Sequence, residues 1–168
     1  MHRTANNYMG GAMKTAKEMV QEKGGDIVCV PVGTTIFEAL QKMCRHKVGA
    51  ILVLRDDEVD GIWTERDLLI HIVSPDFDPK TAPIEDYMTA DLVYAQHDDT
   101  LYSLMDKFLG LRIRHLPIKE DGRFIGLLSS GDVMKAAISA KNAELEKLNA
   151  MIGWEYYENW RWDPDRSR

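Results

Sequence analysis

The sequence has few cysteines and no long apolar run. Only two of its 168 residues are cysteines, Cys29 and Cys44, which favours buried free thiols over a disulfide framework. No apolar stretch approaches the ~20 residues that span a bilayer. Residues 1–11 lack the apolar segment of a signal peptide. We therefore expect a cytoplasmic protein that does not enter a membrane.

Positive charge is also scarce. The chain has 21 Lys and Arg against 27 Asp and Glu, and this net charge of −6 argues against general nucleic-acid binding. His46, His71 and His97 have no partner at ligand spacing, so no metal site is expected. No nucleophile–base–acid set is visible either, so we do not expect an enzyme. With 45% hydrophobic and 29% charged residues, the composition is that of a globular chain.

Two copies of one pattern organise the chain. Residues 61–67 (GIWTERD) recur as residues 126–132 (GLLSSGD), 65 residues further on (126 − 61 = 65). Each has a glycine, two apolar residues, a hydroxyl residue and then an aspartate. The same shift pairs apolar positions upstream, such as Ile36 with Leu101. A repeat of this kind indicates a repeated structural unit. Because one small unit buries little surface alone, we expect the two copies to pack together.

Each copy predicts elements in the order β-α-β-β-α. Short apolar runs predict strands, and apolar residues at helical spacing predict helices. Thr35, followed three residues later by Glu38, forms a capping-box signature at one helix start. The expected strands are 27–30, 48–54, 59–63, 92–95, 113–119 and 124–128; the expected helices are 13–23, 35–46, 64–73, 100–110 and 129–140, with a helical turn at 84–88.

The remaining segments separate or follow the two copies. Three prolines between residues 75 and 83 indicate a linker. The last helix is expected to continue past residue 140 and to stop at Gly153. Residues 154–162 then hold five aromatic residues, which predicts a surface that packs on a partner protein. The expected division is a tail at 1–12, a first copy at 13–74, the linker at 75–83, a second copy at 84–141, and a C-terminal helix with its aromatic tail at 142–168.

The hydroxyl-x-x-aspartate pattern has two interpretations. The simpler one is helix capping, in which Thr64 and Ser129 each accept a hydrogen bond from an exposed helical N–H. The other is ligand binding. The N–H groups and the dipole at a helix start suit a phosphate, and a carboxylate one turn inward, such as Asp67 or Asp132, can accept both hydroxyls of a ribose. The sequence leaves both interpretations open.

The 65-residue unit resembles the cystathionine-β-synthase (CBS) domain, a β-α-β-β-α unit that occurs in tandem pairs called Bateman modules. The resemblance covers roughly residues 13–141 and rests on residues 61–67 and 126–132, on IEDYMT at 84–89, and on RIRHLPI at 112–118. It is closest to small stand-alone prokaryotic CBS pairs that carry no catalytic domain. It implies an α/β fold with pseudo-twofold symmetry. It also implies two clefts that bind AMP, ADP, ATP, NAD or S-adenosylmethionine.

The same resemblance implies roles for individual residues. Asp67 and Asp132 match the ribose-binding aspartates, and Thr64 and Ser129 match the hydroxyls beside them. The residues expected to enclose the adenine are Val28, Val48 and Ile62 in one cleft, and Val93, Ile113 and Leu127 in the other.

Basic residues are expected at the phosphates. Arg114 and His115 resemble a basic pair that contacts phosphates in relatives, and Arg66 is a further candidate. The first copy departs from this pattern, because residues 49–50 (Gly-Ala) stand where Arg114 and His115 stand in the second. The second copy has Gly131 in place of Arg66. We therefore expect the two clefts to differ.

The predicted function is sensing by an adenine-nucleotide-binding CBS pair, without catalysis. The exposed helix faces after Thr64 and Ser129 are expected to form a homodimer, and an unidentified protein is expected at the aromatic tail. Two alternatives stay open. One is a small enzyme that uses Cys29 or Cys44 with a histidine such as His115. The other is a constitutive dimeric interaction scaffold with vacant clefts.

Overall fold

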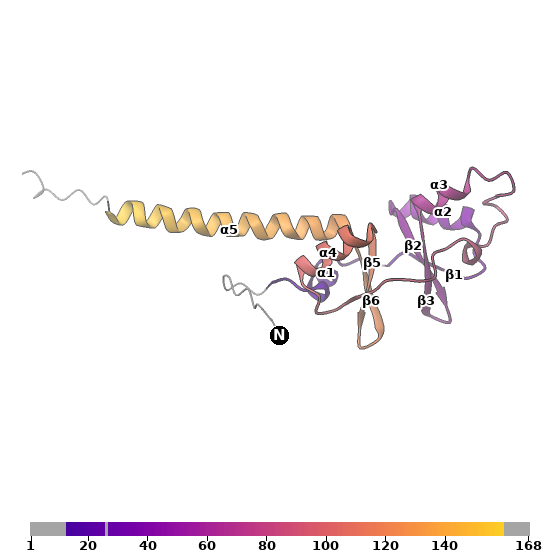
Figure 1. Cartoon of the computed structure of the whole chain (residues 1–168), viewed down its shortest axis with the longest axis horizontal. Helices are drawn as coiled ribbons and strands as arrows, with labels where there is room; N and C mark the ends of the chain where they lie inside the picture. Colours follow the sequence, from indigo (N-terminus) through magenta and orange to yellow (C-terminus); the bar gives the residue numbers. More distant parts are fainter. Residues whose placement is uncertain (1–12, 26, 160–168) are drawn as a thin grey trace, which may run out of the picture.

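The molecule contains two three-stranded sheets of the same topology, which lie side by side (Figure 1). The computed structural model describes residues 13–25 and 27–159, with residues 151–159 as backbone only. In each sheet the first strand runs parallel to the second, and the second pairs antiparallel with the third. The strands are β1 (Cys29–Pro31), β2 (Ala50–Arg55) and β3 (Glu58–Thr64) in the first sheet, and β4 (Ala95–Gln96), β5 (His115–Glu120) and β6 (Arg123–Ser129) in the second.

Helices connect and follow these strands in the same order in both copies. The elements are α1 (Ala16–Lys23), α2 (Ile36–His46), α3 (Glu65–His71), the 3-10 turn η1 (Ile84–Asp86), α4 (Leu101–Leu111) and α5 (Ser130–Asn159). The predicted α/β fold of two β-α-β-β-α repeats is therefore confirmed.

Backbone irregularities recur at matching positions and show how closely the two copies correspond. Lys47 and Arg112, which end α2 and α4, both adopt left-handed conformations. The hairpin turns at residues 56–57 and 121–122 have positive φ at both central residues, as a two-residue hairpin with a matching twist requires. The register shift in the first hairpin lies between Val53 and Leu54, and its counterpart lies in β5. The pseudo-twofold symmetry thus extends to turns and bulges.

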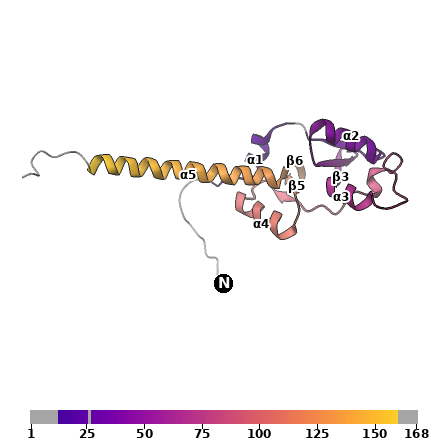
Figure 2. The same ribbon diagram turned by 90° about the horizontal axis from the view of Figure 1, so that it is seen from above.

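Each copy completes its core with a segment that comes from outside its own strands. Ala16 and Met19 of α1 are buried among the side chains of α4, β5 and β6 in the second copy. Conversely, Ala82 and Ile84, which precede the strands of the second copy, are buried in the core of the first. The views in Figures 1 and 2 both place α1 beside β6. The expected division at residues 13–74 and 84–141 assigns α1 to the first copy and Ile84 to the second. In the structure, each of these two segments packs in the core of the other copy.

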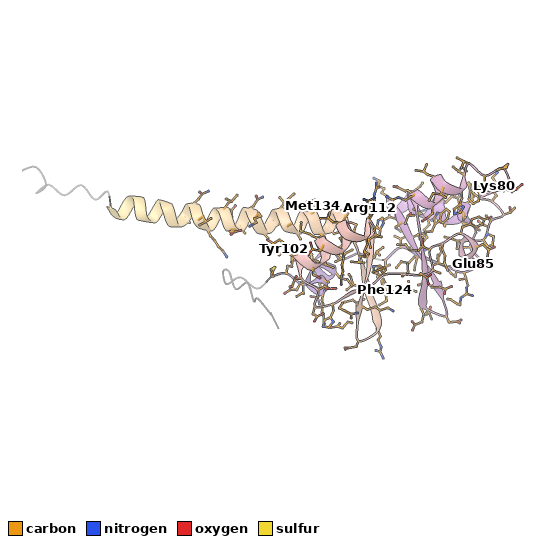
Figure 3. The ribbon with its side chains drawn as sticks, viewed as in Figure 1. Lys80, Glu85, Tyr102, Arg112, Phe124 and Met134 are labelled. Carbon is orange, nitrogen blue, oxygen red and sulfur yellow. The ribbon has the colours of Figure 1, made fainter. Side chains whose placement is uncertain are left out.

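A third cluster joins the two sheets. Ala50, Leu52 and Ile62 of the first sheet are buried, and Leu127 and Phe124 of β6 pack against them. Phe124 is labelled in Figure 3, between the two sheets. Because these side chains come from both copies, the copies form one packed body, as the small size of each unit predicts.

Several boundaries differ from the sequence predictions. Thr15 caps α1 together with Glu18, so this helix begins at Ala16 rather than at residue 13. The expected strand 92–95 is displaced to β4, because Thr89 pairs with Ile62 and residues 90–94 cross between the copies. The predicted stop at Gly153 is wrong, because α5 continues through this glycine to Asn159.

The cysteine prediction is correct in one respect and wrong in another. Both cysteines are free thiols, and Cys29 is partly buried, but Cys44 is exposed on α2. The buried face of α2 consists of Ile36, Ala39 and Met43, and Cys44 falls outside it. In the described part of the chain, no helix is both long and apolar enough to cross a membrane.

Candidate functional site

Two clefts lie between the copies, and each draws its walls from both. The Thr64 cleft has a volume of about 390 Å³, and the Ser129 cleft has a volume of about 340 Å³. Volumes of this size suit a small-molecule ligand. Of the predicted site residues, Ile62, Thr64, Arg66, Asp67, Val93, Ile113, Arg114 and His115 line the Thr64 cleft, and Val28, Val48, His115, Leu127 and Ser129 line the Ser129 cleft.

The predicted grouping of the apolar walls is wrong. Val28 and Val48 do not line a cleft with Ile62; they face Leu127 across the Ser129 cleft. Ile62 instead lines the Thr64 cleft with Val93 and Ile113. The sequence alignment assigns each wall to one copy, but each cleft forms where the two copies meet, so its walls combine residues of both.

In the Thr64 cleft, Asp67 is positioned by the start of α3. Its Oδ2 atom accepts a hydrogen bond from the Thr64 backbone N–H at 2.8 Å and another from the Thr64 hydroxyl at 2.7 Å. Among the described residues, no donor bonds the second carboxylate oxygen of Asp67. Oδ2 of Asp67 is therefore occupied by its bonds to Thr64 at the helix start, and Oδ1 remains available to a ligand.

Asp132 is not among the residues that line either cleft, but it lies at the start of α5 close to Ser129, which lines the Ser129 cleft, and there the arrangement of Asp67 is repeated with an added cation. Asp132 Oδ2 accepts hydrogen bonds from the Ser129 N–H and hydroxyl, both at 2.7 Å, and the Asp132 N–H donates back to the Ser129 hydroxyl at 3.2 Å. The addition is Lys23, whose Nζ donates to Asp132 Oδ2 at 2.8 Å. Burial raises the pKa of Asp132, but the Lys23 and Ser129 donors outweigh burial and hold that pKa below its usual value.

His115 lies between the two clefts and lines both. Burial lowers the pKa of its imidazole, and the Lys23 ammonium lowers it further, while Asp132 and Glu65 act in the opposite direction. Because the net shift is downward from 6.5, His115 is neutral at pH 7 in this structure. In this form the imidazole can donate one hydrogen bond and accept another.

The basic side chains of the Thr64 cleft are exposed. Arg66 and Arg114 both line it, and neither forms a salt bridge with another described residue. The alternative role for Arg114 is a structural ion pair with Asp106 or Glu120, but Glu120 instead accepts a hydrogen bond from Lys17 at 2.5 Å. The Arg114 guanidinium is therefore available at the cleft.

Several residues that line the clefts are additional to those predicted from the sequence. Glu65 and Asp91 add negative charge to the Thr64 cleft, and Lys23 and Lys47 add positive charge to the Ser129 cleft. Glu65 lies within the repeated motif at residues 61–67, but Lys23 belongs to a helix that packs on the other copy. Only the exchange of α1 brings Lys23 to this cleft.

The enzyme alternative requires a cysteine thiol beside a histidine such as His115 in one of the clefts. Cys29 packs against the third cluster, which joins the two sheets, and Cys44 is exposed on α2. Neither is among the residues that line the two clefts, so His115 has no thiol beside it there. Within the described residues, no group of three or more His, Cys, Asp or Glu side chains is arranged to hold a metal ion.

Comparison with known proteins identifies both copies. The family model for the CBS domain matches residues 17–74 and 84–139. A mitochondrial CBS domain-containing protein of Arabidopsis thaliana, CBSX3, is 31% identical over 151 residues, covering 84% of this chain and 73% of its own. The crystal structure of a CBS-domain containing protein from Agrobacterium tumefaciens is 37% identical, with a TM-score of 0.69, covering 74% of this chain and 99% of its own.

Some relatives are longer, and some share only the fold. This chain spans 26% of the length of another Arabidopsis CBS domain-containing protein, to which it is 28% identical. The CBS domain pair of protein MJ0100, solved in complex with 5-methylthioadenosine and S-adenosyl-L-methionine, is 18% identical, with a TM-score of 0.65, and covers 77% of this chain and 98% of its own. A hexameric CBS-CP12 protein from bloom-forming cyanobacteria is 23% identical, with a TM-score of 0.64, covering 74% and 68%.

Proposed function

This chain belongs to the CBS-domain family and carries two copies of the domain in tandem, and from that premise we propose that it is a regulatory module for an adenosine-containing ligand. AMP, ADP, ATP and NAD are the proposed ligands, bound in the Thr64 and Ser129 clefts. The proposal includes no catalytic step. A related fold, the pair of protein MJ0100, holds two adenosine-containing ligands, which supports this class of ligand.

The observation that carries the proposal is the composition of the Thr64 cleft. It combines a carboxylate with one free oxygen on Asp67, an apolar wall that includes Ile62 and Val93, and the arginines Arg66 and Arg114. These groups match the three parts of a nucleotide. A ribose donates hydroxyls to a carboxylate, a base packs on apolar side chains, and a phosphate pairs with guanidinium groups.

The Ser129 cleft offers a related but different set of groups. Val28, Val48 and Leu127 supply its apolar wall, and Asp132 is the proposed ribose partner. Lys23 and Lys47 are its cations, and His115 contributes a neutral imidazole. The two clefts are therefore proposed to differ in affinity, in keeping with the unequal residues of the two copies.

Binding is proposed to act through shape or association. A ligand shifts an equilibrium only if it binds one state more tightly than the other, and both clefts lie where such a change would occur, between the copies. For association, the exposed apolar side chains Leu69 and Ile72 near α3 and Met134 and Ile138 on α5 are the proposed homodimer contact. Met134 is labelled at the start of α5 in Figure 3.

Two further expectations accompany this proposal. The location is proposed to be cytoplasmic, although the Arabidopsis relative is named as mitochondrial. The aromatic tail at 154–162 is proposed to bind a protein partner, and its side chains lie outside the described residues.

Bound nucleotide in the purified protein is the simplest test. The protein is denatured by heat, and the supernatant is separated by anion-exchange chromatography and identified by mass spectrometry. Recovery of an adenine nucleotide from the parent, but not from a double Asp67→Ala/Asp132→Ala variant, would support the proposal. Equal recovery from both would refute the site, and a protein without any ligand that also fails to bind added nucleotide would favour the scaffold alternative.

A further inference from the structure

Lys23 forms a contact in the Ser129 cleft that has no counterpart in the Thr64 cleft. Its Nζ atom donates to Asp132 Oδ2 at 2.8 Å and to the Leu127 carbonyl oxygen at 2.9 Å. Lys23 is the last residue of α1, and both acceptors belong to the second copy. The Lys23 and Asp132 side chains are 40% and 29% exposed, so the ion pair is accessible to solvent. Lys23 lines the cleft, and its bond to Asp132 connects this carboxylate to the lining residues.

The position that corresponds to Lys23 at the other cleft follows from the internal symmetry. Thr15 pairs with Thr100, and Pro83 pairs with Thr35, so Thr15 and Pro83 hold equivalent places. Val20 lies against Gly126 as Met88 lies against Gly61. These pairs share one offset in sequence.

The residue at the same sequence offset from Lys23 is Asp91, although residue 91 is not helical as Lys23 is. Asp91 lines the Thr64 cleft, and an acid there cannot form an ion pair with the Asp67 carboxylate. Among the described residues, Asp132 is therefore paired with a cation and the equivalent Asp67 is not.

We propose that Lys23 is a tethered competitor for the ribose position of the Ser129 cleft, so that this cleft binds an adenosine ligand only when Lys23 leaves Asp132. The inference rests on the proposed function, because it concerns the carboxylate to which a ribose would bind. The ammonium neutralises this carboxylate and occupies one side of Oδ2, where two Ser129 donors already bond. Among the described residues, Oδ1 of Asp132 has no donor, as at Asp67, so the Lys23 ammonium competes with a ribose through its charge and through the space that it occupies beside the carboxylate.

Displacement of Lys23 by a ligand would also loosen the contact between the end of α1 and the second copy. Lys23 is followed by Gly24 and Gly25, both with positive φ and with no atom within 4 Å of the position of an added Cβ. Gly24 and Gly25 come directly after α1, which is packed on the second copy, and precede β1 of the first. A ligand that releases Lys23 therefore releases one of the contacts that hold the end of α1 to β6 and α5.

The test isolates the Ser129 cleft and uses a neutral probe. Asp67→Ala is introduced first to disable the Thr64 cleft, and adenosine is titrated by calorimetry because it carries no charge for a lysine to attract. In that background Lys23→Met should bind adenosine about two- to fivefold more tightly, since a part-exposed ion pair of this kind costs a competitor up to about that factor. Thermal unfolding of every variant confirms that each is folded.

Lys17→Met is the matched control. Lys17 is on the same helix and also bonds a carboxylate of the second copy, Glu120 at 2.5 Å, but it does not line the Ser129 cleft. Its substitution removes the same charge and a comparable contact from α1. Adenosine affinity should therefore be the same in Asp67→Ala and in Asp67→Ala/Lys17→Met.

The outcomes separate this inference from the proposed function. Tighter adenosine binding in Lys23→Met but not in Lys17→Met supports the inference. Unchanged or weaker binding in Lys23→Met overturns it, because Lys23 would then be neutral towards the ligand or a ligand contact itself. Parent protein that binds adenosine, with no binding in Asp67→Ala/Lys23→Met, also overturns it and leaves the Thr64 cleft as the site. Absence of adenosine binding in the parent and in all variants overturns the inference if the parent still binds AMP, ADP, ATP or NAD, and absence of binding of adenosine and of all four nucleotides refutes the proposed function.

Discussion

Val20 of α1 lies directly over the α-carbon of Gly126 in β6. A Cβ atom on Gly126 would be 2.4 Å from Val20 Cγ1 and 2.8 Å from Cγ2, distances that atoms cannot adopt without a shift. The equivalent glycine, Gly61, is covered by Met88, whose sulfur would lie 2.3 Å from the added Cβ. The first residue of each repeated motif is therefore a glycine because a segment from outside that copy's strands packs against it.

Alanine at these glycines should destabilise the fold to different extents. Gly126→Ala should lower the free energy of unfolding by about 1–3 kcal/mol, because the β-branched Val20 cannot move aside without moving α1. Gly61→Ala should cost less, since the flexible Met88 side chain can adopt another rotamer. Urea denaturation measures both.

Gly110→Ala is the control for the glycine substitutions. Gly110 is inside α4, and no atom lies within 4 Å of an added Cβ there. Its substitution should stabilise the protein by up to about 1 kcal/mol, because alanine is the better helix former. A Gly126→Ala variant as stable as the parent would contradict the close approach of α1.

Removal of the Asp67 carboxylate should weaken ligand binding more than it weakens the fold. Asp67→Ala should reduce nucleotide affinity roughly tenfold to a hundredfold, equivalent to the loss of hydrogen bonds worth about 1.5–3 kcal/mol. Loss of the Thr64 cap should cost stability of about 1 kcal/mol or less. Calorimetric titration and urea denaturation measure the two effects separately.

Glu38→Ala provides the comparison for a cap without a ligand. Glu38 accepts hydrogen bonds from the Thr35 N–H at 3.0 Å and hydroxyl at 2.9 Å, and it lines neither cleft. This variant should lose similar stability and keep its affinity. If Asp67→Ala also kept full affinity, the carboxylate would have a capping role alone.

Arg114 should distinguish ligands with phosphates from ligands without them. Arg114→Ala should weaken ATP and ADP more than adenosine, because a charge-assisted contact to phosphate is lost. The readout is the ratio of ATP affinity to adenosine affinity, measured by calorimetry at one ionic strength. Arg123→Ala removes the same charge from an exposed position in the same hairpin and should leave this ratio unchanged. An unchanged ratio in Arg114→Ala would count against a phosphate contact.

The lowered pKa of His115 predicts a pH dependence of stability. Because the folded pKa is below the usual 6.5, the unfolded chain binds a proton more readily than the folded one. Stability should therefore decrease as the pH falls below about 6.5 towards the folded pKa. His115→Gln carries no titrating group, so it should lose less stability than the parent between pH 7.5 and pH 5.5. Equal losses would show that His115 is not desolvated as the structure indicates.

The sequence predicted local features better than contacts between distant segments. Thr35 and Glu38 were recognised as a capping box because their roles depend on four neighbouring residues, and both hydrogen bonds are present. The repeat predicted the order of the strands and helices because the two copies differ little in pattern. By contrast, nothing near Lys23 indicates that it reaches Asp132, because that contact requires α1 to pack on the other copy.

Two errors have simple physical reasons. Each cleft was assigned apolar walls from one copy, whereas Val28 and Leu127 meet only through packing between the copies. Gly153 was expected to end the last helix, but a glycine inside a helix costs only about 1 kcal/mol relative to alanine, and α5 continues through it.

Direct titration of the parent protein tests the central claim most simply. ATP, ADP, AMP and NAD are each titrated into the purified protein by calorimetry, and the melting temperature is measured with and without each nucleotide. At least one should bind saturably and raise the melting temperature with the logarithm of ligand excess, as binding to the folded state alone requires. Absence of both heat and a melting shift for all four at millimolar concentration would contradict a nucleotide-binding role for these clefts.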